Sequence, residues 1–368
     1  MPDLIKLADT VVNNLGNLAI QSDRCCQKRS PKSTCRLCID VCPSESININ
    51  QSGIEIVNCI ECGLCAALCP TGALTWRAPS PLSLISKIKQ CQETYSEVYV
   101  YCSNASLGKN LSQAIEVPCL GSITWQCWLW ILTYNVDVKV YSSENCCSTC
   151  NVNQGYKQYR LHVDRAEQIS GKSITCVSSV IGNKRKRNRN RNSSVNADRR
   201  NFLGAIMNGL GRVPGKIVTR MLSEEDAPPL KAAPNSNFIT EKRQVLIKAA
   251  NYDNRMAERM QVQQPEIVGN CQFCKACSTL CPQGALVQKE NQGTFSLEIS
   301  GVSCIGCKLC TEVCFHKALQ MTSTRINDLR EKVTLAEGRS YTCQDCGSMY
   351  NAINEVTCPA CQKRHQLL

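Results

Sequence analysis

Cysteines are the residues with which this chain could do chemistry, because they number 29 of 368 and fall into runs of fixed spacing. The spacing C-x2-C-x2-C-x3-C-P occurs over residues 59–70 and again over residues 271–282. A third run, over residues 304–314, keeps the cysteines but is followed by Phe315. Three thiolates on such a loop surround one [4Fe-4S] cluster, and the fourth cysteine ligates a second cluster. The spacing therefore predicts clusters in pairs.

The two runs nearer the C-terminus are complete, and together they supply eight thiolates. Because the fourth cysteine crosses to the other cluster, each run contributes three ligands to one cluster and one to its neighbour. Phe315 replaces a proline, which costs the turn some rigidity but removes no ligand. The expected ligands are Cys271, Cys274, Cys277 and Cys314 for one cluster, and Cys304, Cys307, Cys310 and Cys281 for the other.

The two runs nearer the N-terminus lack one cysteine. The first of them reads Cys35-x2-Cys38-x3-Cys42-Pro43, and Lys32 occupies the position where the pattern has its first cysteine. We expect the missing thiolate to come from Cys25 or Cys26, of which we favour Cys25; if neither reaches, a three-iron cluster or no cluster would form. The expected ligands are Cys25, Cys35, Cys38 and Cys69 for one cluster, and Cys59, Cys62, Cys65 and Cys42 for the other.

Residues 24 to 77 and 266 to 322 resemble the two-cluster bacterial ferredoxin family through these runs. The resemblance implies two small electron-transfer modules. In each we expect an antiparallel hairpin with a Gly-containing turn, over residues 46–58 and 294–303, where apolar and polar residues alternate. Short helices are expected after each Cys-Pro pair. Structural zinc on the same cysteines is the alternative, but zinc sites favour isolated C-x2-C pairs.

Residues 97 to 179, between the modules, have a different pattern. Short β-branched runs alternate with stretches of helical periodicity, which predicts a small parallel sheet of α/β type. The strands of such a sheet end at one edge, where binding sites are built. Cysteines follow three of these strands and a further one lies a turn later, so we expect a metal site formed by Cys102, Cys119, Cys146 or Cys147, and Cys150.

This middle segment resembles the delta subunit of methyl-viologen-reducing hydrogenase. The similarity rests on Cys102, on Val117-Pro118-Cys119-Leu120-Gly121 and on Cys146-Cys147-x2-Cys150. It implies a [2Fe-2S] cluster, with Cys102, Cys119, Cys146 and Cys150 as ligands, and electron transfer to heterodisulfide reductase. The sequence departs from that family at residues 103–105, where a second cysteine is usual. The alternative is that these cysteines are small buried hydrophobic residues, as we expect of Cys127 and Cys176.

The last four cysteines form two C-x2-C knuckles, Cys343 with Cys346 and Cys358 with Cys361, separated by eleven residues. Four thiolates in this arrangement make a closed tetrahedral site, which folds a segment too short to have a core of its own. The segment resembles a zinc ribbon, so we expect one zinc ion. A one-iron site like that of rubredoxin is the alternative, although rubredoxins have a longer insert and an aromatic core.

The formal charge is +12, with 42 lysines and arginines against 30 acidic residues. Sixteen cluster thiolates would leave each of four sites at roughly −2 and the protein at about +4, so most of the basicity balances the clusters. The basic run over residues 184–191 is typical of a solvated linker, and we expect no nucleic-acid partner. The N-terminus lacks a signal peptide and no apolar stretch reaches about 18 residues, so we expect a cytoplasmic protein without a membrane span.

We therefore expect an α+β multidomain protein. Its predicted parts are an N-terminal helix (1–23), ferredoxin module 1 (24–80), a hydrogenase-delta-like α/β middle domain (85–180), a basic flexible linker (183–240), a helical lead-in (241–265), ferredoxin module 2 (266–325) and a zinc-ribbon-like terminal segment (340–368).

The expected function is electron transfer, as a non-catalytic subunit of an anaerobic oxidoreductase complex of the hydrogenase or heterodisulfide-reductase kind. Its partners would be redox proteins or catalytic subunits, and electrons would pass between the modules through the middle domain or a partner. The alternative is a cluster-based redox sensor that binds nucleic acid or a protein partner through its basic linker and zinc ribbon.

Overall fold

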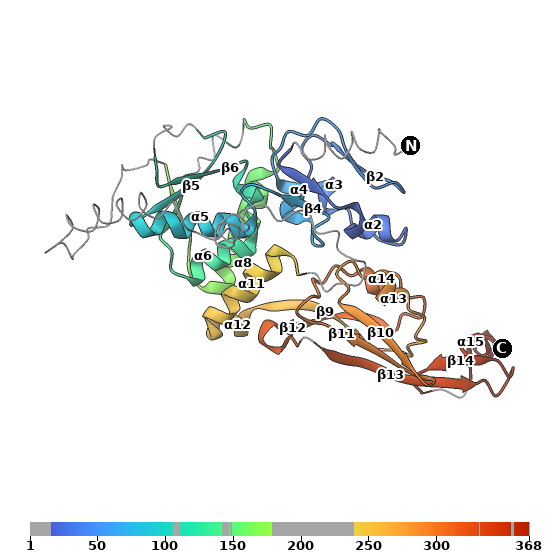
Figure 1. Ribbon diagram of the computed structural model, residues 1–368. Helices are drawn as coiled ribbons and strands as arrows, with labels where there is room; N and C mark the ends of the chain where they lie inside the picture. Colours follow the sequence, from blue (N-terminus) through green and yellow to red (C-terminus); the bar gives the residue numbers. More distant parts are fainter. Residues whose placement is uncertain are drawn as a thin grey trace, which may run out of the picture. The chain divides into compact units, whose positions relative to one another are not determined.

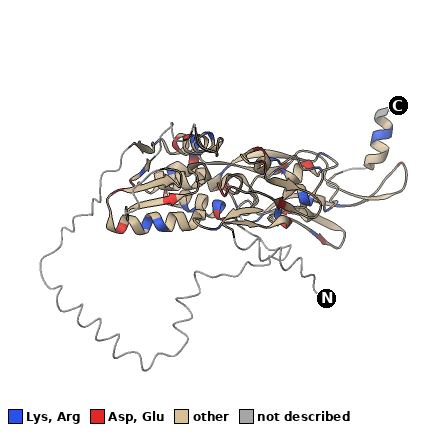
Figure 2. Cartoon of the chain, turned by 90° about the horizontal axis from the view of Figure 1, so that it is seen from above, with Lys and Arg blue, Asp and Glu red and all other residues tan. Residues whose placement is uncertain are grey.

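The computed structural model of the chain describes residues 16–105, 111–141, 147, 149–178, 239–330, 332–354 and 357–367 (Figure 1). Most of the predicted linker and residues 1–15 of the predicted N-terminal helix lie outside the described residues. Among the described helices, none is long and apolar enough to cross a membrane. Figure 2 shows that basic and acidic residues are interspersed over the described elements.

Module 1 is built from two short antiparallel ribbons. Strand β2 (Ile47–Ile49) pairs with β3 (Ile54–Ile56), which confirms the predicted hairpin, and β1 (Leu18–Ile20) pairs with β4 (Leu74–Trp76). The predicted helix over residues 1–23 is therefore wrong at residues 18–20, which form a strand. The reason is tertiary, because Leu18 and Ile20 pack against the core of the module and such pairing overrides local propensity.

Short helices occur in every cysteine run, but they end before the fourth cysteine. They are α3 (Leu37–Asp40), α4 (Leu64–Leu68), α13 (Ala276–Thr279) and α14 (Leu309–Glu312), and module 1 also has α2 (Cys26–Arg29) after the turn η1 (Ser22–Arg24). The prediction of helices after each Cys-Pro pair is wrong. In three of the runs the proline disfavours helical backbone in the cysteine before it, so the helix must end earlier.

Module 2 repeats the two ribbons. Strand β9 (Gln261–Ile267) pairs with β12 (Leu319–Arg325), and β10 (Leu286–Asn291) pairs with β11 (Thr294–Ile299). The module thus begins at residue 261 and not at 266. Its hairpin turn is Gln292-Gly293, with φ of 47° and 76°, and not the predicted region around Gly301. Positive φ at both positions of a two-residue turn matches the twist of the flanking strands.

The terminal segment shares a sheet with module 2. Strand β13 (Val333–Thr342) pairs with β11 on one side and with β14 (Met349–Ala352) on the other, which gives the strand order β10-β11-β13-β14. Helix α15 (Pro359–Leu367) follows. The segment predicted to begin at residue 340 therefore starts inside β13, a strand that pairs with β11 of module 2.

The middle domain contains the predicted parallel sheet. Its strands are β5 (Val98–Cys102), β6 (Ala114–Val117), β7 (Val138–Tyr141) and β8 (Thr175–Val177), all parallel, in the order β6-β5-β7-β8. Its helices are α5 (Pro81–Thr94), α6 (Trp125–Thr133) and α8 (Gly155–Ser170), with a 3-10 turn η2 (Leu120–Ser122). Helix α5 was not predicted and begins before residue 85, with Ser80 as its N-cap and Pro81 in its first turn.

Helices α11 (Glu241–Tyr252) and α12 (Asn254–Arg259) form the helical lead-in, which ends at residue 259 because β9 follows. Apolar residues of α11, such as Val245 and Ala249, belong to the same core as the helices of the middle domain. A 3-10 turn, η3 (Ile326–Asp328), adds Ile326 to this core. Cys127 is buried there as predicted, whereas Cys176 is exposed, because β8 is an edge strand.

Candidate metal centres

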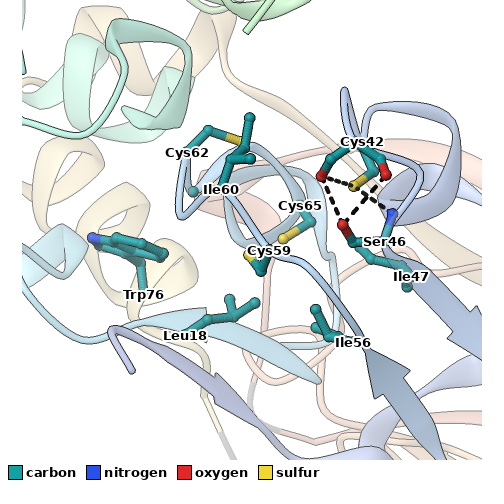
Figure 3. A pocket seen from close by; sticks show the side chains of 12 residues that line it. Leu18, Cys42, Ser46, Ile47, Ile56, Cys59, Ile60, Cys62, Cys65 and Trp76 are labelled. Atoms are coloured by element: carbon teal, nitrogen blue, oxygen red, sulfur yellow. Dashed lines mark hydrogen bonds between the residues drawn. The ribbon is translucent and has the colours of Figure 1, made fainter. Parts of the chain in front are cut away.

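Four cysteines of module 1 face one pocket that is otherwise lined mainly by apolar side chains (Figure 3). Cys42, Cys59, Cys62 and Cys65 share it with Leu18, Ile47, Ile56, Ile60 and Trp76. Burial raises the pKa of the Cys65 thiol, and the charges of neighbouring thiolates, those of Cys62 and Cys59 foremost, add to the shift. Thiols crowded in this way ionise readily only beside a compensating cation, which a thiolate-binding metal centre provides. The pocket therefore fits the predicted cluster.

A second pocket in module 1 is lined by Cys25, Cys26, Cys35, Cys38 and Cys69 together with Ile49, Ile54 and Leu74. Burial raises the pKa of Cys38 to about 12, and the charges of Cys69 and Cys25 contribute to the shift. Cys26 borders the same pocket, but the main influence on its thiol is a hydrogen bond with Cys307 of module 2, which raises the pKa of Cys26. Cys25 and Cys26 thus both line the pocket, but only for Cys26 is the strongest influence a thiol of the other module.

The turn η1 and helix α2 place Cys25. Its N–H donates to the Ser22 carbonyl at 2.9 Å, and its own carbonyl accepts the Arg29 N–H at 3.0 Å, so Cys25 begins α2 from an extended backbone. Lys32 has a different partner, since its ammonium group lies 3.4 Å from the centroid of the Phe315 ring. The two departures from the ferredoxin pattern, one in each module, therefore contact each other.

Module 2 gathers its eight cysteines in two groups. Cys281, Cys304, Cys307 and Cys310 line one pocket with Leu286 and Ile305. In the other group, burial raises the pKa of Cys277 to about 12, and the charges of Cys271, Cys274 and Cys314 add to the shift. Each group combines three cysteines of one run with the last cysteine of the other run.

The backbone around the second cysteine is left-handed in the three complete runs. Positive φ occurs at Glu61 (53°), Gly63 (75°), Phe273 (49°), Lys275 (65°), Gly306 (68°) and Lys308 (67°). Non-glycine residues adopt this conformation at a cost of roughly 1–2 kcal/mol each, so their surroundings must hold it. The N–H of Glu61 donates to Cys59 Sγ at 3.4 Å, and that of Phe273 donates to Cys271 Sγ at 3.5 Å. Such bonds to sulfur influence a cluster's reduction potential.

In the middle domain the carboxyl ends of the strands and the segments after them bring Cys102, Cys119, Cys147 and Cys150 to one pocket. Cys146 lies outside the described residues, so Cys147 is the member of that pair which the structure places here. Burial raises the pKa of Cys119 to about 12, and the charge of Cys102 contributes to the shift. These four thiols fit a thiolate-bound metal centre for the same reason as those of the modules.

Sequence reasoning missed Asn104 and also missed the contact of Cys26 with module 2. Asn104 Nδ2 donates to Cys150 Sγ at 3.1 Å, from the segment where the delta-subunit family has an additional cysteine. No motif marks this donor. For Cys26, the pair Cys25-Cys26 indicated that one thiol is a ligand, but it held no sign that the other contacts a different module.

Gly155, the first residue of α8, packs against the middle-domain site. A Cβ at this position would lie 2.6 Å from Cys119 Sγ and 3.2 Å from Val152 Cγ1. We therefore expect Gly155→Ala to displace Cys119 and to lower the iron content by about two atoms per chain. Iron analysis beside Lys157→Ala, an exposed change on the same helix, checks this. Full iron in Gly155→Ala would show that Cys119 is not a ligand.

The four terminal cysteines are close enough to share one ion. The sulfur atoms of Cys343, Cys346, Cys358 and Cys361 all lie within 4.8 Å of one another, and those of Cys346 and Cys358 are 3.7 Å apart. A tetrahedral zinc ion with sulfur at about 2.3 Å requires sulfur atoms about 3.8 Å apart. The group therefore fits a single ion.

Hydrogen bonds prepare these terminal thiols for metal binding. Ser348 hydrogen-bonds the sulfur of Cys346 and lowers the pKa of that thiol to about 6. The Cys358 N–H donates to Cys343 Sγ at 3.2 Å. Because the thiolate is the metal-binding form, these bonds favour metal binding at neutral pH.

Comparison with known protein families identifies two iron-sulfur domains in the chain. Residues 270–319 match the family described as 4Fe-4S dicluster domain, and residues 58–75 match the 4Fe-4S binding domain. The first match contains both runs of module 2, and the second contains the complete run of module 1. The search of curated proteins found no match for the chain. The chain thus contains two ferredoxin-type domains, and such iron-sulfur domains imply electron transfer.

Proposed function

We propose that this chain is a multi-cluster electron-transfer protein, a non-catalytic subunit of an anaerobic oxidoreductase of the hydrogenase or heterodisulfide-reductase kind. It would hold four [4Fe-4S] clusters, a [2Fe-2S] cluster in the middle domain and one zinc ion in the terminal segment. Bound clusters supply one-electron chemistry. The residues of the chain provide the ligands, exclude water and donate hydrogen bonds to sulfur.

The observation that carries this proposal is that the cysteine groups adjoin one another in single file. Cys119 of the middle domain packs against the buried core of module 1, which contains Cys62, Cys65 and Cys38. Cys277 and Cys310 pack against one core in module 2. Between the modules, Cys35 and Cys307 pack against the same small cluster of Cys26, Leu309 and Val313. Each of these five groups therefore has a neighbour in the file.

Direct contact between the modules supports this order. Arg29 of module 1 donates to the carbonyls of Leu280 and Thr279 of module 2, both at 2.9 Å. The Thr34 hydroxyl donates to Glu312 at 2.6 Å. Electrons would then cross from module to module without the middle domain, contrary to the expectation from sequence, and the middle-domain site would lie at one end of the file.

Purification without oxygen, followed by iron, sulfide and zinc analysis, tests the proposed function. About sixteen iron atoms per chain are expected from four cubanes, or about eighteen with the two-iron centre, together with about one zinc ion. Dithionite should reduce the protein reversibly, as followed by EPR. A preparation with zinc in place of iron and labile sulfide would contradict the proposal.

A further inference from the structure

The first turn of helix α11 contains two adjacent basic residues, Lys242 and Arg243, whose side chains bind different modules. The first turn of the helix is capped by Thr240, whose hydroxyl accepts the Arg243 N–H at 3.3 Å. Later turns of the same helix pack in the core of the middle domain. One short rigid segment thus presents both cations.

The ammonium group of Lys242 is enclosed at the end of α4 in module 1. Its Nζ donates to the carbonyls of Ala66 at 2.6 Å, Ala67 at 2.8 Å and Cys69 at 2.7 Å. Carbonyls in the last turn of a helix lack intrahelical partners, and Pro70 has no N–H to offer them. A cation is also favoured at this end of a helix dipole. Lys242 therefore satisfies groups that the cysteine run leaves without partners.

Arg243 makes the corresponding contacts in module 2. Its Nε donates to the Val302 carbonyl at 3.2 Å, and a terminal nitrogen donates to the carbonyls of Gly301, at 3.1 Å, and Cys304. Its side chain is buried. The three carbonyls belong to the segment that leads into the Cys304 run, so each cation contacts a different cluster-binding segment.

Both cations lie where a charge has a strong effect. The Lys242 ammonium group has three N–H donors, and three carbonyls accept from it. Burial lowers the pKa of Lys242, while the charges of Cys69 and Cys127 oppose the shift. Burial also lowers the pKa of Arg243, and the charge of Cys304 opposes it. Among the described residues, no carboxylate makes an ion pair with either side chain.

We propose that Lys242 and Arg243 form a two-headed cationic clamp, in which Lys242 raises the reduction potential of the site that contains Cys69 and Arg243 raises that of the site that contains Cys304. The inference rests on the proposed function, because it requires a cluster at both sites. A nearby cation favours the state with one more negative charge. These two sites adjoin each other between the modules, because Cys35 and Cys307 pack against the same cluster of buried residues. An electron in the file would therefore reside preferentially at this central pair.

Glutamine variants test the clamp, because glutamine can still donate hydrogen bonds but carries no charge. Midpoint potentials of the full-length protein, purified without oxygen, are measured by EPR titration with dithionite as the electron donor. Lys242→Gln should lower the potential of one component and Arg243→Gln that of a different one. In each variant the equilibrium constant for reduction should fall at least tenfold, which lowers the midpoint potential of a one-electron couple by about 59 mV. Lys242→Arg and Arg243→Lys should keep potentials near those of the wild type.

Lys248→Gln is the matched control, because Lys248 is exposed on the same helix and its replacement removes the same charge. The clamp would be overturned if the midpoint potentials of the two glutamine variants shift no more than that of this control. It would also be overturned if both variants shift the potential of the same component. If a glutamine variant fails to fold, methionine at that position replaces it in the titration. A wild-type protein without iron would contradict the proposed function, whereas full iron with unshifted variants would contradict only the clamp.

Discussion

Changing Cys25 to alanine is expected to remove a cluster from module 1, whereas the same change at the adjacent Cys26 should leave every cluster in place. The iron content should fall by about four atoms per chain in Cys25→Ala, or by about one if a three-iron remnant persists. Both cysteines line one pocket with Cys38 and Cys69, but the charge of Cys25 acts on Cys38, whereas the thiol of Cys26 forms a hydrogen bond with Cys307.

Iron and sulfide analysis of the two variants, with EPR of the reduced protein, provides the measurement. The pair is closely matched, because both thiols are buried, with 8% and 3% of the residue exposed. Loss of packing should therefore affect both variants alike. Iron lost from Cys26→Ala and retained in Cys25→Ala would reverse the assignment, and equal losses from both would show that iron content reports folding and not ligation.

The cysteine groups were accessible from the sequence because a cluster-binding loop imposes its own spacing on the chain. The family matches confirm the 4Fe-4S domains over residues 58–75 and 270–319. Local alternation over residues 46–58 was likewise sufficient for the β2–β3 hairpin, and β-branched runs for the parallel sheet. In each case neighbouring residues carry the information.

Features that depend on distant residues could not be predicted. Residues 18–20 form a strand only because β4 lies beside them. The contacts of Lys242 join residues 173 to 176 positions apart, and a lysine after Glu241 at the start of a helix is typical of a solvent-exposed face. The Lys32–Phe315 contact could not be predicted either, because in the sequence each residue is only a departure from the pattern of its own cysteine run.

Loss of the terminal metal is expected to unfold the end of the chain while leaving the iron in place. The small core of this segment consists of Cys343, Cys358 and Cys361 with Tyr350 packed against them. Structural zinc contributes about 10–16 kcal/mol in zinc-finger peptides, far more than so few apolar contacts. We therefore expect Cys361→Ala to lose its zinc and the fold beyond residue 342.

Zinc and iron analysis, limited proteolysis and hydrogen exchange together check this expectation. Trypsin should cleave at Lys363 and Arg364 in the variant, and β14 should lose its exchange protection. The control is His365→Ala on the same helix. It removes an exposed contact of 3.2 Å between His365 Nε2 and Asp345 Oδ2 and should keep the zinc.

The position at which protection is lost would also test the shared sheet. Because β11 pairs with β13 over residues 333–339, that part of β13 should stay protected after the metal is lost, while its pairing with β14 disappears. Loss of the whole strand would mean that the metal also supports module 2. Full protection of β14 without zinc would mean that the segment folds without metal, since β13 alone would then suffice to hold it.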